Sequence, residues 1–321
     1  MLELSIVIPV FNCVALTQAC LKSLEETIGT RSDFEVIIVD NASTDGTAEW
    51  LSTLPAPRYR IIRNERNLGY AAANNAAARV ADGRLLLLLN NDTVLLPAWL
   101  EPMLRVLAHV EKAGLVGNVQ REAETGLIDH AGILFTVEGA PRHFGMDLVS
   151  PPPQEYRRFP AVTGACWLLP RAVFIGLRGF SEDYLNSYED VDFCLRLRQE
   201  GLYCYVANRS VIYHHVSASP GRRQADVANF AKFGERWGAT ISGLAEIHRQ
   251  ITAKRTQWTA MLPSEKQIQR ERRQDGWRYL QKHAWRPWRY NAGRLRRAFT
   301  GILSRLPAPP RVSVVEPFFF E

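Results

Sequence analysis

The chain has 321 residues, of which 46% are hydrophobic and 22% are charged. Such a composition is typical of a globular protein with one large core, or a core plus an appendage. The five cysteines include no C-x-x-C pair, which argues against a disulfide framework and a zinc knuckle. The first residues, LELSIVIPV, lack the basic and long apolar regions of a signal peptide. We therefore expect a cytoplasmic protein in a reducing compartment.

The net charge of +6 is unevenly distributed along the chain. Residues 249–306 contain 15 Lys and Arg but only 3 Asp and Glu, which leaves the rest of the chain slightly acidic. This asymmetry indicates a basic appendage that binds a surface, rather than a basic catalytic groove. We do not expect nucleic acid as the partner.

The first ninety residues alternate between strand and helix patterns. Continuous apolar runs predict buried strands, and apolar residues at helical spacing, first after a possible N-cap at Asn12, predict helices. The strands are expected at 4–10, 34–40, 59–64 and 84–90, and the helices at 12–28 and 70–81. This alternation predicts an α/β fold with a mostly parallel, Rossmann-like sheet and helices on both faces.

The second half is less regular. LVGNV and HAGILFTV each predict a strand, and residues 150–160 form a proline-rich loop. AVTGACWLLPRAVF predicts a strand followed by the start of a helix. A further helix should start at YEDVD and end at Gly201, and YCYVANRSVIYHH should form two short strands.

Polar residues follow all four strands of the first half. The strand exits read PVFN, VDNASTDGT, NERNLGYAAANN and NNDT. Each exit alone could be a turn, because Asn and Asp tolerate tight backbone geometry. Ligands of parallel α/β sheets, however, bind at the carboxyl ends of the strands. Four polar exits at one edge therefore favour a ligand site.

Six segments in fixed order resemble the family-2 glycosyltransferases. They are SIVIPVFN, VDNASTDGT, NLGYAAANN, LLLLNNDT, GFSEDYLNSYEDVDFCLRLRQEG and HHVSAS, and they span about residues 4–220. The NLGYAAANN and NND forms most resemble rhamnosyltransferase-like members. The resemblance implies the GT-A nucleotide-diphospho-sugar transferase fold, with a catalytic domain at 1–248 divided into a nucleotide-binding half (1–92) and an acceptor half (93–248). A basic amphipathic helical extension (249–306) and a Pro-rich, apolar tail (307–321) would follow.

The resemblance assigns donor binding to the strand exits. Asp40 would bind the base, with Asp40 as a simple helix cap remaining the alternative. Asp45 is expected to brace its loop. The full set expected to bind the nucleotide donor is Pro9, Phe11, Asn12, Asp40, Asn41, Asn67, Gly69, Asn74, Asn90 and Asn91.

A divalent cation, Mg²⁺ or Mn²⁺, would stabilise the departing diphosphate. Asn90-Asn91-Asp92 stands where the family carries its D-x-D motif, so Asp92 is the expected metal ligand, although Asn90 replaces the first aspartate. His214 matches a further metal ligand of the family and is preferred to His215, because neighbouring strand residues face opposite sides. A structural histidine remains the alternative.

The acidic group YEDVD supplies the expected catalytic residues. Asp190 maps to the general base that takes the proton of the acceptor hydroxyl, and Glu189 to an acceptor ligand. Asp192 is expected to cap or orient the helix. Acidic residues also favour the first turn of any helix, so a structural role stays open. Trp167 would form part of the acceptor wall, or else belong to the core.

The sequence therefore predicts an inverting glycosyltransferase of cell-wall or surface polysaccharide biosynthesis, which moves a sugar such as rhamnose to a saccharide or lipid-linked acceptor. The alternatives are a UDP-hexose or UDP-galactofuranose donor, or a catalytically silent membrane-associated scaffold. Residues 270–306 mix arginines, tryptophans and an apolar stripe. Such a segment is suited to an anionic membrane surface, so we expect a peripheral protein at the inner face of the cell membrane. Docking of the stripe on the catalytic domain is the alternative.

Overall fold

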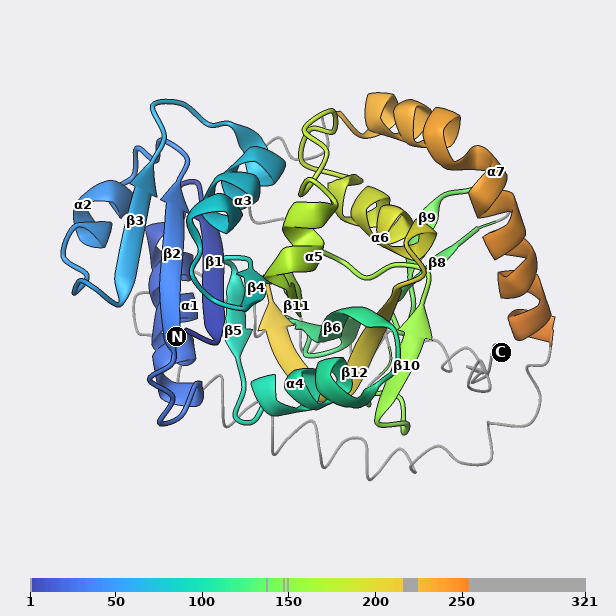
Figure 1. Ribbon diagram of the computed structural model, residues 1–321, viewed down its shortest axis with the longest axis horizontal. Coiled ribbons are helices and arrows are strands. Elements are labelled where there is room, and N and C mark those ends of the chain that lie inside the picture. Colours follow the sequence, from blue (N-terminus) through green and yellow to red (C-terminus); the bar gives the residue numbers. More distant parts are fainter. Residues whose placement is uncertain (1, 137, 147, 149, 216–224, 254–321) are drawn as a thin grey trace, which may run out of the picture. The chain divides into compact units, whose positions relative to one another are not determined.

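The computed structural model describes residues 2–215, except 137, 147 and 149, and residues 225–253 (Figure 1). Met1–His248 form one compact unit. The predicted division of the chain at residue 248 stays a prediction. Most of the expected extension, from residue 254 to 306, and the tail at 307–321 lie outside the described residues.

The N-terminal half alternates strands and helices as the apolar pattern predicts. Its elements are β1 (Leu4–Val10), α1 (Val14–Thr27), β2 (Phe34–Asp40), α2 (Thr47–Leu51), β3 (Tyr59–Arg63), α3 (Gly69–Val80), β4 (Leu85–Leu89), β5 (Thr93–Leu95) and α4 (Leu100–His109).

The C-terminal half has more strands than helices. Its elements are β6 (Ala113–Glu122), β7 (Ile128–His130), β8 (Ile133–Phe135), β9 (Pro141–His143), β10 (Tyr156–Phe159), β11 (Cys166–Pro170), α5 (Arg171–Gly176), α6 (Glu189–Gln199), β12 (Tyr203–His214) and α7 (Asp226–Ala253).

The central sheet has the strand order β10-β12-β6-β11-β4-β1-β2-β3, with β5 paired to β12 and β7 paired to β6. Strands β4, β1, β2 and β3 are parallel, as expected, so their carboxyl ends lie at one edge (Figure 1). The other half is mixed, because β11 runs antiparallel to both β4 and β6. The α/β fold class is confirmed, and the sheet is less parallel than the sequence suggested.

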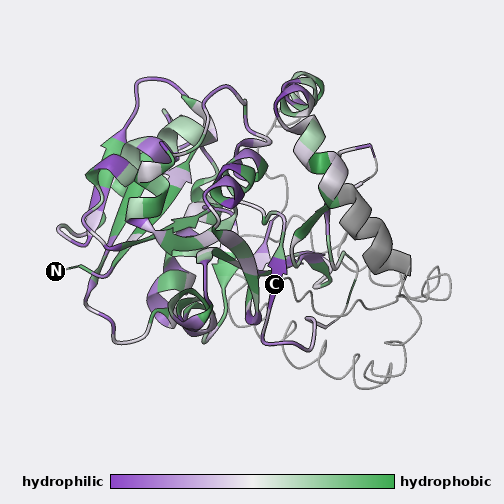
Figure 2. Cartoon of the chain, turned by 45° about the vertical axis from the view of Figure 1, so that its right-hand side comes forward, coloured by the Kyte–Doolittle hydropathy of each residue, from purple (hydrophilic) through white to green (hydrophobic). Residues whose placement is uncertain are grey.

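The sheet separates two hydrophobic cores, one on each face. All five leucines of β4 are buried, with Leu86 and Leu88 in one core and Leu85, Leu87 and Leu89 in the other. Each buried leucine stabilises the fold by about 1.5–3 kcal/mol. Figure 2 shows largely hydrophobic strands between helices in which hydrophobic and hydrophilic residues alternate. Both faces of β4 are covered, and this explains its unbroken run of leucines.

The cysteines are all free, and four of them are buried. Cys20 and Cys166 belong to one core, and Cys194 and Cys204 belong to the other. Among the described residues, no helix is both long enough and apolar enough to cross a bilayer.

Three local expectations are corrected by the structure. Helix α1 begins after Cys13 instead of Asn12, because the Asn12 side chain accepts a hydrogen bond from Thr44 N at 2.7 Å. The segment HAGILFTV is two strands, separated at Gly132 with φ 128°, where a Cβ would lie 2.4 Å from the Phe159 ring. The two short strands expected before His214 are one strand, β12, with an irregular register between Ala207 and Val211.

Candidate functional site

The ends of β1, β2 and β3 bring the first group of predicted residues together. Val10, Asp40 and Arg63 stand at matching register positions on the three strands. Pro9 is buried within β1, whose ladder with β4 extends only through Val7. The missing N–H of Pro9 therefore leaves that ladder intact.

Asp40 is almost fully buried at the end of β2. Its Oδ1 accepts a hydrogen bond from Ser43 N at 2.9 Å, and its Oδ2 lies 3.6 Å from Arg63 Nε. Asp40 therefore stabilises the turn that follows β2, and it does not cap a helix, because the N-cap of α2 is Gly46. The Arg63 side chain is 57% exposed. It can therefore move away from Oδ2 of Asp40.

The loop after β2 is held against the start of α1. Asn12 N donates to Ser43 Oγ at 2.8 Å, in addition to the Asn12 contact with Thr44. Asp45 accepts hydrogen bonds from Val14 N at 3.0 Å and from the Thr47 hydroxyl at 2.5 Å. Asp45 thus braces the loop as expected. Phe11, at the same edge, has 38% of its surface exposed.

A chain of amides connects β2 and β3 to the start of α3. Asn64 Nδ2 donates to Asn41 Oδ1 at 2.7 Å, and Asn41 Nδ2 donates to the Gly69 carbonyl at 3.3 Å. Asn67 Oδ1 accepts from Gly69 N at 2.9 Å. Gly69 has φ 84°, a conformation that favours glycine. Sequence reasoning missed Asn64, although its place directly after β3 matches that of the other strand-end residues.

Asn74 and Asn90 each keep one oxygen available. Asn74 Nδ2 donates to the Tyr70 carbonyl at 2.9 Å, and Asn90 N donates to the Ala165 carbonyl at 2.9 Å. Within the described part of the chain, the buried Oδ1 atoms of Asn74 and Asn90 have no hydrogen-bond partner. Buried amide oxygens are normally satisfied, so both are suited to contact a bound group. Asn91 instead donates from Nδ2 to Thr17 Oγ1 at 2.9 Å, which places it against α1.

Asp92 and His214, the two expected metal ligands, lie next to each other. Strand β12 pairs with β5 so that His214 faces Thr93, and His215 N donates to the Asp92 carbonyl at 2.8 Å. His214 Nε2 lies 3.2 Å from Asp92 Oδ1. Both side chains are largely buried.

This pair fits two positions around one cation. Adjacent ligands of an octahedral ion at 2.0–2.1 Å lie about 3 Å apart, close to the observed separation of the two atoms. Over the described ranges, however, no three Cys, His, Asp or Glu residues gather as a metal site. Any further ligands would therefore come from other groups, such as the Asn90 amide, water or the diphosphate itself.

The acidic residues Glu189 and Asp190 begin α6. Asp190 Oδ2 accepts from Gly164 N at 3.0 Å, and its Oδ1 accepts from Val191 N at 2.7 Å. Tyr70 OH donates to the Gly164 carbonyl at 2.7 Å, so helix α3 contacts the segment that holds Asp190. Glu189 is 6% exposed.

Trp167 requires a correction. Its side chain has no exposed surface, and its ring packs against Phe180 and Phe193 at centroid distances of 5.4 and 5.5 Å. A side chain enclosed in this way belongs to the core and does not line an acceptor surface. The sequence GACWLLP left both possibilities open.

His130 is a buried histidine that sequence reasoning did not single out. Its Nε2 accepts hydrogen bonds from Gly132 N at 3.2 Å and Thr163 N at 3.4 Å. Burial, and then the neighbouring His143 and His214, hold the pKa of His130 well below its ordinary value. His130 is therefore a neutral support for the segment that leads to Gly164. The only sequence signal for this role was that His130 begins the apolar segment HAGILFTV, which predicts a buried strand.

Comparison with known proteins identifies the family. A model of glycosyl transferase family 2 matches residues 5–177, more than half of the chain. The chain belongs to glycosyl transferase family 2. The expected GT-A fold agrees with the solved structure of GalNAc-T7 with UDP, GalNAc and Mn²⁺, which matches at a TM-score of 0.56 and 17% identity, over 67% of this chain and 44% of that one.

Two relatives carry names that indicate an activity or a pathway. The chain is 35% identical over 202 residues to the O-antigen biosynthesis protein RfbC of Myxococcus xanthus, covering 60% of this chain and 16% of that protein. It is 27% identical over 226 residues to the N-acetylglucosaminyl-diphospho-decaprenol L-rhamnosyltransferase of Mycobacterium tuberculosis, covering 62% and 72%. The chain thus spans less than a fifth of the first relative and most of the second.

Proposed function

We propose that this family-2 chain is an inverting glycosyltransferase that moves a sugar from a nucleotide-diphosphate donor to a hydroxyl of a saccharide or lipid-linked acceptor. One observation carries the proposal. The neighbouring residues Gly164 and Ala165 bind both parts of the site, because Gly164 N donates to Asp190 and the Ala165 carbonyl accepts from Asn90 N. The candidate base and the polar end of β4 therefore meet at one short segment.

Donor binding is proposed for the edge formed by β1, β2 and α3. The exposed Phe11 ring is suited to stack on a base, and the buried Asp40 carboxylate is suited to accept its N–H groups. The remaining polar groups would contact ribose and phosphates. They are Asn12, Asn41, Asn67, Gly69, Asn74 and Asn90.

Asp92 and His214 are proposed to hold a divalent cation, Mg²⁺ or Mn²⁺. Such an ion supplies Lewis acidity that stabilises the charge of the departing diphosphate. Asn90 adds an oxygen but no charge, so the protein contributes one carboxylate to the ion where a D-x-D motif contributes two. We expect cation affinity to depend strongly on Asp92.

Asp190 is proposed as the general base. Its two oxygens each accept one backbone N–H, and each oxygen retains a second lone pair for the proton of the acceptor hydroxyl. Glu189 is proposed as an acceptor ligand beside it. A single base without a covalent nucleophile gives direct displacement and inverts the anomeric centre.

Rhamnose is the proposed donor sugar, because the Mycobacterium tuberculosis relative is named as a rhamnosyltransferase and aligns over most of its length. By the same similarity, and from RfbC, the proposed pathway class is surface polysaccharide or cell-wall biosynthesis. Purified protein should be incubated with nucleotide-diphospho-rhamnose, UDP-glucose and UDP-galactofuranose, each with Mg²⁺, Mn²⁺ or EDTA. Metal-dependent release of nucleoside diphosphate from one donor supports the proposal, and release from none of them contradicts it.

Membrane attachment through residues 270–306 is a separate proposal that rests on their basic and aromatic composition. It would place a cytoplasmic enzyme at the inner face of the cell membrane, beside a lipid-linked acceptor. The full chain should sediment with vesicles containing anionic lipid at low salt and dissociate at high salt. Equal sedimentation with neutral vesicles, or none with either, would count against it.

A further inference from the structure

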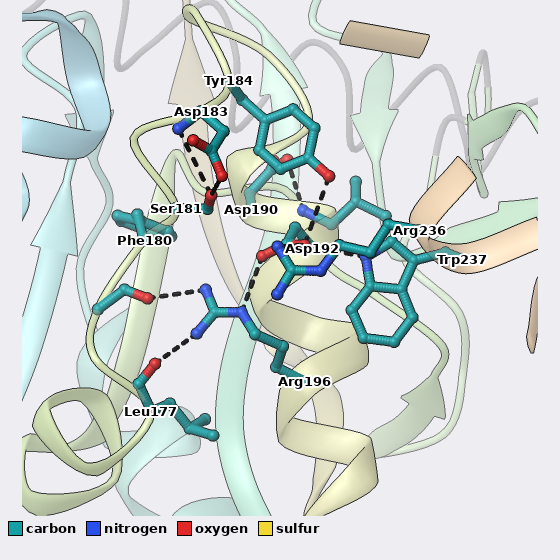
Figure 3. Close-up of polar contacts among 12 residues, drawn as sticks. Leu177, Phe180, Ser181, Asp183, Tyr184, Asp190, Asp192, Arg196, Arg236 and Trp237 are labelled. Atoms are coloured by element: carbon teal, nitrogen blue, oxygen red, sulfur yellow. Dashed lines mark hydrogen bonds and ion pairs between the residues drawn. The ribbon is translucent and has the colours of Figure 1, made fainter. Parts of the chain in front are cut away.

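Helix α6 carries a third carboxylate, Asp192, that is completely buried. Its Oδ2 accepts a hydrogen bond from Arg196 Nε at 2.8 Å, and its Oδ1 accepts one from Trp237 Nε1 at 2.9 Å. Arg236 Nη1 lies 3.1 Å from Oδ1, and the Tyr184 hydroxyl lies 3.5 Å from it (Figure 3). A buried charge with this many partners is costly to disturb.

The partners of Asp192 connect three parts of the chain. Arg196 also donates to the carbonyls of Leu177 and Gly179, at 2.5 and 2.7 Å, so it fixes the start of the loop that leads to α6. Trp237 and Arg236 belong to α7. Asp192 therefore joins α6 to this loop and to α7, as Figure 3 shows.

Helix geometry relates this cluster to the candidate base. Two residues along an α-helix correspond to a rotation of about 200°, so Asp190 and Asp192 project from opposite sides of α6. Asp190 contacts Gly164, while Asp192 contacts α7. The rotation of α6 about its axis is thus held from both sides.

The loop that precedes α6 has a strained backbone and is held by hydrogen bonds from α7. Asn186 and Tyr188 have φ values of 56° and 73°, which are unfavourable for residues other than glycine. Asn229 of α7 holds this stretch by donating to the carbonyls of Leu185 and Ser187 at 3.0 and 3.2 Å. Helix α7 therefore supports the loop before Glu189 as well as the first turn of α6.

We propose that Asp192 is a positioning residue: its contacts with Arg196, Trp237 and Arg236 fix the rotation of α6 and hold the Asp190 carboxylate against Gly164 N. The inference rests on the proposed role of Asp190 as the base. It differs from a purely structural role, in which loss of Asp192 would weaken the whole fold and affect every function equally.

The test is Asp192→Asn in the full chain. The variant keeps an oxygen that accepts the hydrogen bond of Trp237. Its amide N–H, however, faces the N–H of Arg196 Nε, so the hydrogen bond to Arg196 is lost. We expect kcat for transfer to fall about 10²-fold, because small misplacements of a reacting group have effects of this size, while the KM for the donor stays within about twofold. Amide exchange measured by NMR should accelerate at Gly164 and stay unchanged at Val7 and Leu87 in the core strands.

The matched control is Asp183→Asn, an exposed acid of the same loop whose carboxylate contacts Ser181 Oγ at 3.0 Å. It should leave kcat, KM and Gly164 exchange at wild-type values. A folded Asp192→Asn protein with wild-type kcat would overturn the proposal. So would a fall in kcat accompanied by an equal rise in KM and faster exchange throughout the core.

If Asp192→Asn does not fold, Trp237→Phe removes one donor to Asp192 and keeps an aromatic ring. It should lower kcat and accelerate Gly164 exchange in the same selective way, and wild-type values of both would overturn the proposal. Failure of the base assignment is recognised separately. If Asp190→Asn retains transfer, Asp190 is not the base, and Gly164 exchange still reports whether Asp192 positions it.

Discussion

Replacing Asp190 by asparagine should lower the rate of sugar transfer much more than it lowers the stability of the fold. Both carboxylate oxygens accept a backbone N–H, from Gly164 at 3.0 Å and from Val191 at 2.7 Å. An amide has one oxygen, so it satisfies one of these donors and turns N–H toward the other. For a half-buried group, this loss should destabilise the fold by about 1–2 kcal/mol. At this chain length the melting temperature should fall by only a few degrees.

The effect on the reaction should be much larger than the effect on stability. Loss of a general base typically slows a reaction about 10²–10⁴-fold, which corresponds to about 3–5 kcal/mol of activation free energy. Transfer should be measured by release of nucleoside diphosphate well below the melting temperature, with donor affinity measured by titration. We expect near-normal donor affinity and a rate reduced at least 10²-fold. Transfer by the folded variant within about tenfold of wild type would refute the assignment.

Three further predictions concern the proposed metal ligands and a buried histidine. Asp92→Ala should weaken nucleoside-diphosphate binding far more with Mg²⁺ or Mn²⁺ than in EDTA, and equal weakening would make Asp92 structural. Asn90→Asp should tighten cation binding measured by calorimetry, because it adds a carboxylate at the end of β4; unchanged affinity would place residue 90 away from the ion. His130 has a depressed pKa in the folded state, so the unfolded chain binds more protons below its ordinary pKa of 6.5. Stability should fall from pH 6.5 to 5 by up to about 1.4 kcal/mol per pH unit, and His130→Asn, but not the exposed His109→Asn, should flatten that slope in denaturant titrations.

The parallel half of the fold could be predicted because each of its strands and helices is indicated by its own stretch of sequence. Each strand contains a run of apolar residues, and each ends in or is followed by polar residues such as Asp40 and Asn90. Parallel pairing then brings these ends to one edge. The same reasoning would have found Asn64, which stands in an equivalent position after β3.

The second half could not be predicted to the same extent, because its arrangement depends on distant pairing. Strand β11 inserts antiparallel between β4 and β6, and nothing in CWLLP specifies either neighbour. That insertion decides the burial of Trp167 and places Gly164 beside Asp190. The family resemblance assigns different roles to Asp190 and Asp192 of YEDVD, but their contacts depend on distant segments: Asp190 accepts a hydrogen bond from Gly164 N, and Asp192 contacts α7.

The reactivity of the buried free cysteines reports how often each layer of the fold opens to solvent. Burial raises the pKa of Cys20 to about 12, and the pKa values of Cys166 and Cys194 are also raised by burial. The thiolate is the nucleophile that attacks a thiol reagent, so these buried side chains react only when the surrounding layer opens. Because Cys20 and Cys166 lie on one face of the sheet and Cys194 and Cys204 on the other, labelling rates followed residue by residue would show whether the two layers open together or one before the other.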